Sequence, residues 1–128
     1  MRAIDTNVVV RFLTGDDPGQ AARARAVVDA GDIFISTTVL LESEWVLRGV
    51  YGFARAEVVT ALRAFLGLPG ISVDKPDLIA EALDRTGQEM DFADALHLGA
   101  ASQCKEMLTF DRQFIVSAND ARIRVAEP

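Results

Sequence analysis

The chain has 128 residues, of which half are apolar and a quarter are charged. This length is typical of one domain, so we expect a single domain over residues 1–128, and the composition excludes a disordered chain. The formal net charge of −6 argues against nucleic-acid binding by a basic surface, because neutralising phosphates requires clustered Lys and Arg.

Location is constrained by three further features. No uncharged apolar run approaches the roughly 18 residues of a membrane helix, and the charge of Asp5 comes too early for a signal peptide. The single cysteine, Cys104, cannot form an internal disulfide. We therefore expect a cytoplasmic protein with no membrane partner, in which Cys104 is a small core residue of an Ala-rich helix.

Short apolar segments alternate with helical ones along the chain. In order, the sequence predicts a strand at 3–5, a helix at 20–30, a strand at 33–36, helices at 37–48 and 56–66, a strand at 71–73, helices at 76–84 and 91–103, and strands at 107–110 and 123–125. Thr37 or Thr38 is the expected N-cap of the helix at 37–48. This alternation predicts a parallel sheet with helices on both faces. Ligands of such sheets bind where the strands end, and Asp5 and Asp111 follow the first and fourth strands.

A pair of acids opens the helix predicted at 91–103. Asp91 and Asp94 are three residues apart, so both carboxylates lie on one face of that helix. Each also has a purely structural interpretation, with Asp91 as the N-cap and Asp94 in the first turn. Asp111 and Asp5 have the same alternative, because each precedes a helical segment.

Glu42 and Glu44 are separated by their helical spacing. Side chains two positions apart point to nearly opposite sides, so both cannot serve one site. Glu44 has Arg48 four residues later, which favours a solvated surface pair. Glu42 has apolar neighbours instead, and a carboxylate on an apolar face needs a metal, a donor or a neutral state. We therefore take Glu42 as the candidate.

Together these acids suit a hard divalent cation. Mg²⁺ prefers carboxylate oxygens and retains several waters, and two such cations can activate water and stabilise a leaving oxygen in phosphodiester cleavage. Four carboxylates would suffice for that chemistry, with a fifth, Asp91, in support; the four are Asp5, Glu42, Asp94 and Asp111. No zinc-type Cys/His spacing, phosphate-binding Gly-rich loop or nucleophile elbow competes.

Four segments carry a family resemblance: IDTN at 4–7, Glu42 with Trp45, DFADALH at 91–97 and TFD at 109–111. In this order and spacing they resemble PIN-domain ribonucleases, and most closely the VapC toxins of bacterial and archaeal toxin–antitoxin pairs. The resemblance spans about residues 3–125. It implies a three-layer α/β sandwich with a central, mostly parallel sheet flanked by helices.

The same resemblance implies an endoribonuclease that uses Mg²⁺ or Mn²⁺, forms a homodimer and is held inactive by an antitoxin protein. By motif position, the family's catalytic and metal-binding acids correspond to Asp5, Glu42, Asp94 and Asp111. Three further positions match supporting residues, namely Asp91, Thr6 and Asn7.

The argument that the net charge excludes nucleic-acid binding weakens once these acids are set aside. Removing the five from the nineteen acidic residues changes the formal charge from −6 to −1, so RNA could approach. Possible phosphate contacts are Arg11, Arg23, Arg25 and Arg112, although the sequence favours an ordinary surface charge for each of them. Near the acids we expect a hydrogen-bonded structural histidine and core aromatics rather than a base or stacking platform; these residues are His97, Trp45, Phe92 and Phe110.

Three other functional classes compete with this interpretation of the sequence. A phosphoacceptor receiver domain has this length and acids at strand ends. It needs an acid pair after the first strand, where Asp5 stands alone, and a Lys after a late strand, where Phe110 and Asp111 offer none. A haloacid-dehalogenase-type phosphatase needs a second Asp where Asn7 stands. A catalytically silent interaction module of the same fold is the other alternative.

Overall fold

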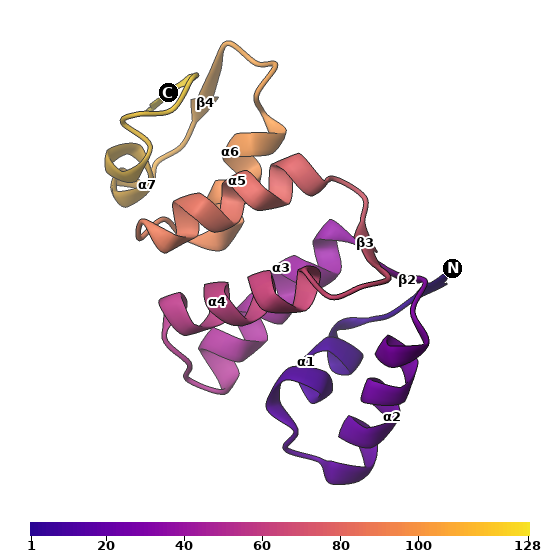
Figure 1. Ribbon diagram of the computed structural model, residues 1–128. Helices are drawn as coiled ribbons and strands as arrows, with labels where there is room; N and C mark the ends of the chain where they lie inside the picture. The colour runs from indigo at the N-terminus through magenta and orange to yellow at the C-terminus, as the bar shows by residue number, and fades with distance from the viewer. The chain divides into compact units, whose positions relative to one another are not determined.

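The computed structural model describes residues 1–128 and divides them into two compact units, Met1–Pro76 and Asp77–Pro128 (Figure 1). Both units combine helices with parallel strands, which confirms the predicted α/β class. No helix is long and apolar enough to cross a membrane.

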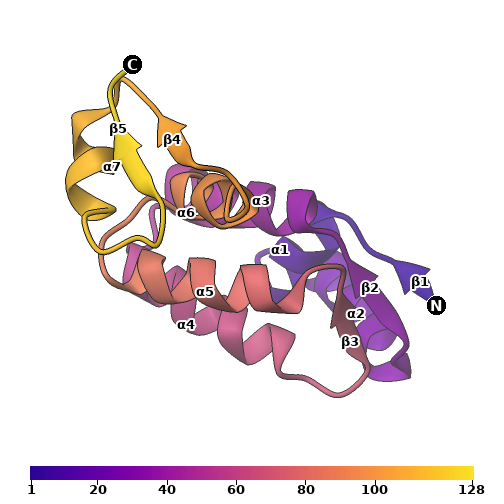
Figure 2. The same ribbon diagram turned by 90° about the horizontal axis from the view of Figure 1, so that it is seen from above.

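The first unit is built around three short parallel strands. Its elements are β1 (Arg2–Ala3), α1 (Thr6–Thr14), α2 (Pro18–Ala30), β2 (Ile33–Ile35), α3 (Thr37–Trp45), the π-helical turn η1 (Val46–Val50), α4 (Arg55–Leu66) and β3 (Ile71–Val73). Arg2 pairs with Ile33, and Ile33 pairs with Ile71, so the strand order is β1-β2-β3. Figure 2 shows the three strands side by side. Each parallel pair needs a helical crossover, which α1 and α2 provide first and α3 and α4 provide second.

The core of this unit comes from the apolar stripes. Ile33 and Ile35 of β2 are both fully buried. The sequence predicts an apolar stripe of five residues in α4, of which Val58, Val59, Leu62 and Phe65 are buried and Leu66 is half-buried. The rings of Phe12 and Phe65 lie 5.0 Å apart and connect α1 with α4. Burying aromatic and branched side chains in this way supplies most of the stabilisation of a small unit.

Two boundaries in α3 differ from the prediction. The N-cap is Ser36, whose hydroxyl accepts a hydrogen bond from Val39 N at 3.2 Å, rather than Thr37 or Thr38. The α-helix ends at Trp45 and continues as η1, where Tyr51 N donates to Val46 O. A π-turn changes the facing of the residues after it, and its i→i+5 spacing leaves no signature in the apolar pattern.

The second unit pairs two strands with three helices. Its elements are α5 (Pro76–Gly87), which begins at the unit boundary, α6 (Phe92–Ala100), β4 (Glu106–Leu108), α7 (Arg112–Ser117) and β5 (Arg124–Ala126). β4 and β5 are parallel, with Glu106 opposite Arg124. α5 and α6 approach closely at Gly99, where an added Cβ atom would clash with Leu78 Cδ1.

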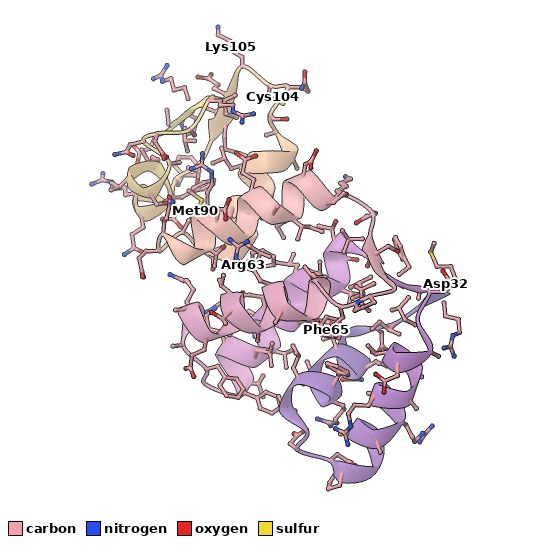
Figure 3. The ribbon with its side chains drawn as sticks, in the orientation of Figure 1. Asp32, Arg63, Phe65, Met90, Cys104 and Lys105 are labelled. Atoms are coloured by element: carbon pink, nitrogen blue, oxygen red, sulfur yellow. The ribbon has the colours of Figure 1, made fainter.

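Cys104 corrects one expectation. α6 ends at Ala100, three residues before the predicted end, because the next hydrogen bonds, from Ser102 N to Gly99 O and from Cys104 N to Ala101 O, are the i→i−3 bonds of turns. Cys104 therefore lies outside the helix and is exposed, beside Lys105 in the turn after α6 (Figure 3). The prediction of a buried core cysteine is wrong.

Candidate functional site

Asp5 lies between β1 and α1 and caps the helix. Its Oδ1 accepts a hydrogen bond from Val8 N at 3.3 Å, and its backbone is extended, as an N-cap requires. The side chain is nevertheless exposed. The structural role considered from the sequence is therefore present, and it leaves the carboxylate accessible to a ligand.

The carboxylate of Glu42 is held in place by a residue of α1. The hydroxyl of Thr6 donates a hydrogen bond to Glu42 Oε1, and Thr6 itself is only 7% exposed. Because Thr6 follows Asp5 in the chain, this bond holds the Glu42 carboxylate beside the N-terminal turn of α1. One oxygen of Glu42 is thus oriented by a neutral donor, and no cation pairs with this carboxylate in the structure.

The exposures assigned to Glu42 and Glu44 are reversed in the structure. Glu44 is 1% exposed and is paired with Arg48, whose Nε lies 2.9 Å from Glu44 Oε2. Glu42 is exposed. The ion pair was predicted correctly, but its placement at the surface was wrong. α3 has apolar residues on every side, so an apolar neighbour does not identify the buried face.

The three acids of the second unit lie at helix N-termini. Asp91 caps α6, with Oδ2 accepting from Asp94 N at 3.2 Å. Asp111 caps α7, with Oδ1 accepting from Gln113 N at 2.9 Å and from Phe114 N at 3.2 Å. Asp94 stands in the first turn of α6. These are the favourable positions for acids on helix-dipole grounds.

Electrostatics set Asp94 apart from its neighbours. Burial raises the pKa of the Asp94 carboxyl, the negative charges of Asp91 and Asp111 raise it further, and His97 acts in the opposite direction. The three carboxylates are thus close enough to repel one another. The second unit therefore holds a cluster of acids in which the central, half-buried member is disfavoured in its ionised form.

The other residues near the acids are more exposed than expected. Phe92 is fully buried, as predicted, but Trp45 is 56% exposed and Phe110 is 80% exposed, so their assignment to the core is wrong. His97 is exposed, which contradicts a structural histidine held by hydrogen bonds. Trp45 lies against Gly49, whose added Cβ would meet the indole at 3.6 Å. The indole ring can pack there because Gly49 has no side chain.

The donor types fit a hard divalent cation, because carboxylate oxygens are its preferred ligands. The raised pKa of Asp94 fits as well, since a cation would offset the repulsion. No group of three or more His, Cys, Asp and Glu side chains lies close enough together to hold a metal ion in this structure. The candidate carboxylates are divided between the two units, with Asp5 and Glu42 in the first and Asp91, Asp94 and Asp111 in the second.

Sequence reasoning missed a polar pocket of the first unit that α1 and α2 line together. It includes Asn7 and Arg11 from α1 and Gln20 and Arg23 from α2. Spacings of three and four residues place each pair on one face of its helix. The sequence alone does not indicate that these two faces meet.

Residues 3–119 match the family described as the PIN domain. The match includes all five candidate acids and runs through both units. A search among curated proteins finds no match.

Proposed function

Because the chain belongs to the PIN domain family, whose members are typically metal-dependent nucleases, we propose that it is an endoribonuclease that hydrolyses RNA phosphodiester bonds with Mg²⁺ or Mn²⁺. The observation that carries the proposal is the extent of the family match, which covers residues 3–119 and every acid of the quartet. Family membership also removes the grounds for a phosphoacceptor receiver domain. It supports one PIN domain over residues 1–128.

The proposed metal ligands are Asp5, Asp94 and Asp111, and Glu42 completes the set or orients the attacking water. A bound divalent cation supplies an activated water and neutralises charge on the phosphate oxygens. Thr6 is a positioning residue, because its hydroxyl fixes Glu42 Oε1 and leaves Oε2 for other contacts. Asp91 orients the first turn of α6 through Asp94 N, and Asn7 is exposed one turn into α1.

Metal-restored cleavage tests this proposal. Chelator-treated protein is incubated with a panel of end-labelled single-stranded RNAs, with and without Mg²⁺ or Mn²⁺. We expect internal cuts only when metal is present, and none from Asp111→Asn; Asp29→Asn, an exposed acid of α2 outside the set, serves as the matched control. A protein that cuts no RNA with either metal is the catalytically silent module, and the proposal fails.

The finer biological role is part of the same proposal. We propose a toxin that acts on cytoplasmic RNA as a homodimer and is inhibited by an antitoxin. Acids that repel one another attract a basic side chain, so an antitoxin that inserts Arg or Lys among them would inhibit. Replacing that basic residue of the antitoxin should release cleavage. If the antitoxin still inhibits fully after every such basic residue is replaced, it blocks access to the acids by steric exclusion alone.

A further inference from the structure

α1 and α2 lie side by side in the first unit (Figure 1), and a pocket of about 340 Å³ opens between them. This volume falls in the range of roughly 300–1,000 Å³ that is typical of small-molecule sites. The polar lining consists of Asn7, Arg11, Gln20 and Arg23, and the apolar lining consists of Val8, Ala24 and Val27.

The charge of this pocket is opposite to that of the chain. Two guanidinium groups and no carboxylate line it, although the chain has a net charge of −6. Arg11 forms a salt bridge with Asp16, which does not line the pocket, whereas Arg23 is exposed and forms none. A lining of this kind favours an anionic ligand, because guanidinium matches the oxygens of phosphate.

Arg11 is held in place before any ligand binds. Its Nε donates to Gln20 Oε1 at 2.7 Å, and its Nη1 donates to Tyr51 Oη at 2.9 Å and to Asp16 Oδ1 at 3.0 Å. Its Nη2 donates no hydrogen bond in the structure. The side chain is therefore fixed while two N–H groups remain available, so little rotamer freedom is lost on binding.

The remaining lining suits the rest of a nucleotide. Val8, Ala24 and Val27 offer an apolar surface to a base or ribose, while Asn7 offers amide hydrogen bonds. Asn7 is also the residue after Thr6, which holds Glu42. Along the chain, the pocket lining therefore begins two residues after Asp5, a proposed catalytic residue.

We propose that this pocket binds one nucleotide of a single-stranded RNA substrate, with its phosphate on Arg23 and Arg11 Nη2 and its base against the apolar lining. The assignment rests on the proposed function and names the part of the protein that holds the RNA strand next to the bond that is cut.

Two substitutions of exposed residues test it without disturbing the core. Arg23→Gln removes one guanidinium, and Gln20→Glu places a carboxylate beside Arg11, whose existing hydrogen bond it preserves. Their matched controls are Lys75→Gln and, on α2, Ala22→Glu, which change charge at exposed residues that do not line the pocket. The probe is a fluorescent single-stranded RNA in chelator, measured by anisotropy, so that binding is scored without cleavage.

We expect Arg23→Gln and Gln20→Glu each to weaken RNA binding by about tenfold, with the controls within about twofold. Arg23→Gln should also reduce the slope of log affinity against log salt by about 1. The proposal is overturned if both pocket variants bind RNA as the controls do while the wild type still cleaves RNA with metal, since the proposed function then stands without this pocket. It is also overturned if they lose only the binding of an inhibitor protein. A wild type that neither binds nor cleaves RNA contradicts both proposals.

Discussion

Asp94 is the residue in which stability and proposed function oppose one another most clearly. Burial and the charges of Asp91 and Asp111 raise the pKa of its carboxyl, so the ionised form is less favourable in the folded protein than in the unfolded chain. Stability from this group is present at low pH and is lost as the pH rises through the folded-state pKa. Such a cost is expected at a site that awaits a cation.

Replacing Asp94 by Asn should therefore stabilise the metal-free protein at pH 7. The variant loses a favourable charge at the start of α6, worth about 0.3–1 kcal/mol, but it also loses the repulsion, which we expect to be larger. Thermal melts in chelator should place Asp94→Asn above wild type at pH 7, and the difference should vanish below the ordinary aspartate pKa of about 3.9. A variant that melts lower at pH 7 would identify Asp94 as a simple helix-start acid.

Glu42 and Glu44 should divide activity and stability between them. Glu42→Gln keeps the acceptor of the Thr6 hydrogen bond but removes a proposed catalytic charge, so cleavage should be lost while the free energy of unfolding changes by less than about 0.5 kcal/mol. Glu44→Gln removes the buried partner of Arg48 and should lower the free energy of unfolding by about 1–3 kcal/mol. Single-turnover cleavage and urea denaturation measure the two effects.

The opposite assignment has a clear signature. If Glu44→Gln, assayed under conditions where it is fully folded, loses cleavage while Glu42→Gln retains it, then the buried ion pair belongs to the reaction and Glu42 does not.

At the residue scale, the sequence predicted helix caps better than it predicted which side chains are buried. The caps at Asp5, Asp91 and Asp111 were predictable, because an acid before a helical run satisfies free backbone N–H groups. The burial of Glu44 was not predictable, because α3 has no polar face from which its orientation could be determined. The exposure of Phe110 depends on tertiary packing that no local pattern records.

At the element scale, the strands are short and depend on the turns that align them. β3 was predicted with its observed bounds, Ile71–Val73, because Gly70 precedes it and Asp74 and Lys75 follow it. α6 was predicted too long, because alanines continue the helical composition past the turn at Ala101. Composition thus predicts that an element exists, and the hydrogen bonds at its end decide where it stops.

Gly70 should be the most sensitive glycine of this sheet. Its φ is +80°, and an added Cβ would lie 2.9 Å from Gly31 Cα and 3.0 Å from Asp32 N. Its carbonyl also accepts the Ile33 N–H at 2.8 Å. Gly70→Ala should lower the free energy of unfolding by about 2–3 kcal/mol through strain and overpacking.

Gly52 separates these two causes. Its φ is +77°, but nothing lies within 4 Å of an added Cβ, so Gly52→Ala should cost only the backbone strain of about 1 kcal/mol. Urea midpoints of the two variants compare the costs directly. Equal losses would mean that the backbone of Gly31 and Asp32 moves freely and does not fix the start of β2.

At the scale of the whole molecule, five of the nineteen acids are the candidate acids, and without them the formal net charge would be −1 instead of −6. Metal that binds only the folded protein should stabilise it by RT ln(1 + [L]/Kd), about 2.7 kcal/mol at a hundredfold excess over Kd. Melts in Mg²⁺ should rise for wild type and for Asp29→Asn and should rise less for Asp94→Asn. An equal rise in all three would indicate weak, general screening of surface charge.

Direct Mn²⁺ binding tests the central proposal, which is that Asp5, Glu42, Asp94 and Asp111 serve as ligands of a divalent cation. Calorimetric titration of chelator-stripped protein should give saturable binding for wild type and for the control Glu44→Gln. Asp5→Asn and Asp94→Asn should each weaken that binding by about tenfold or more. Wild-type affinity in either of these two variants, or no saturable binding by wild type, would contradict the account.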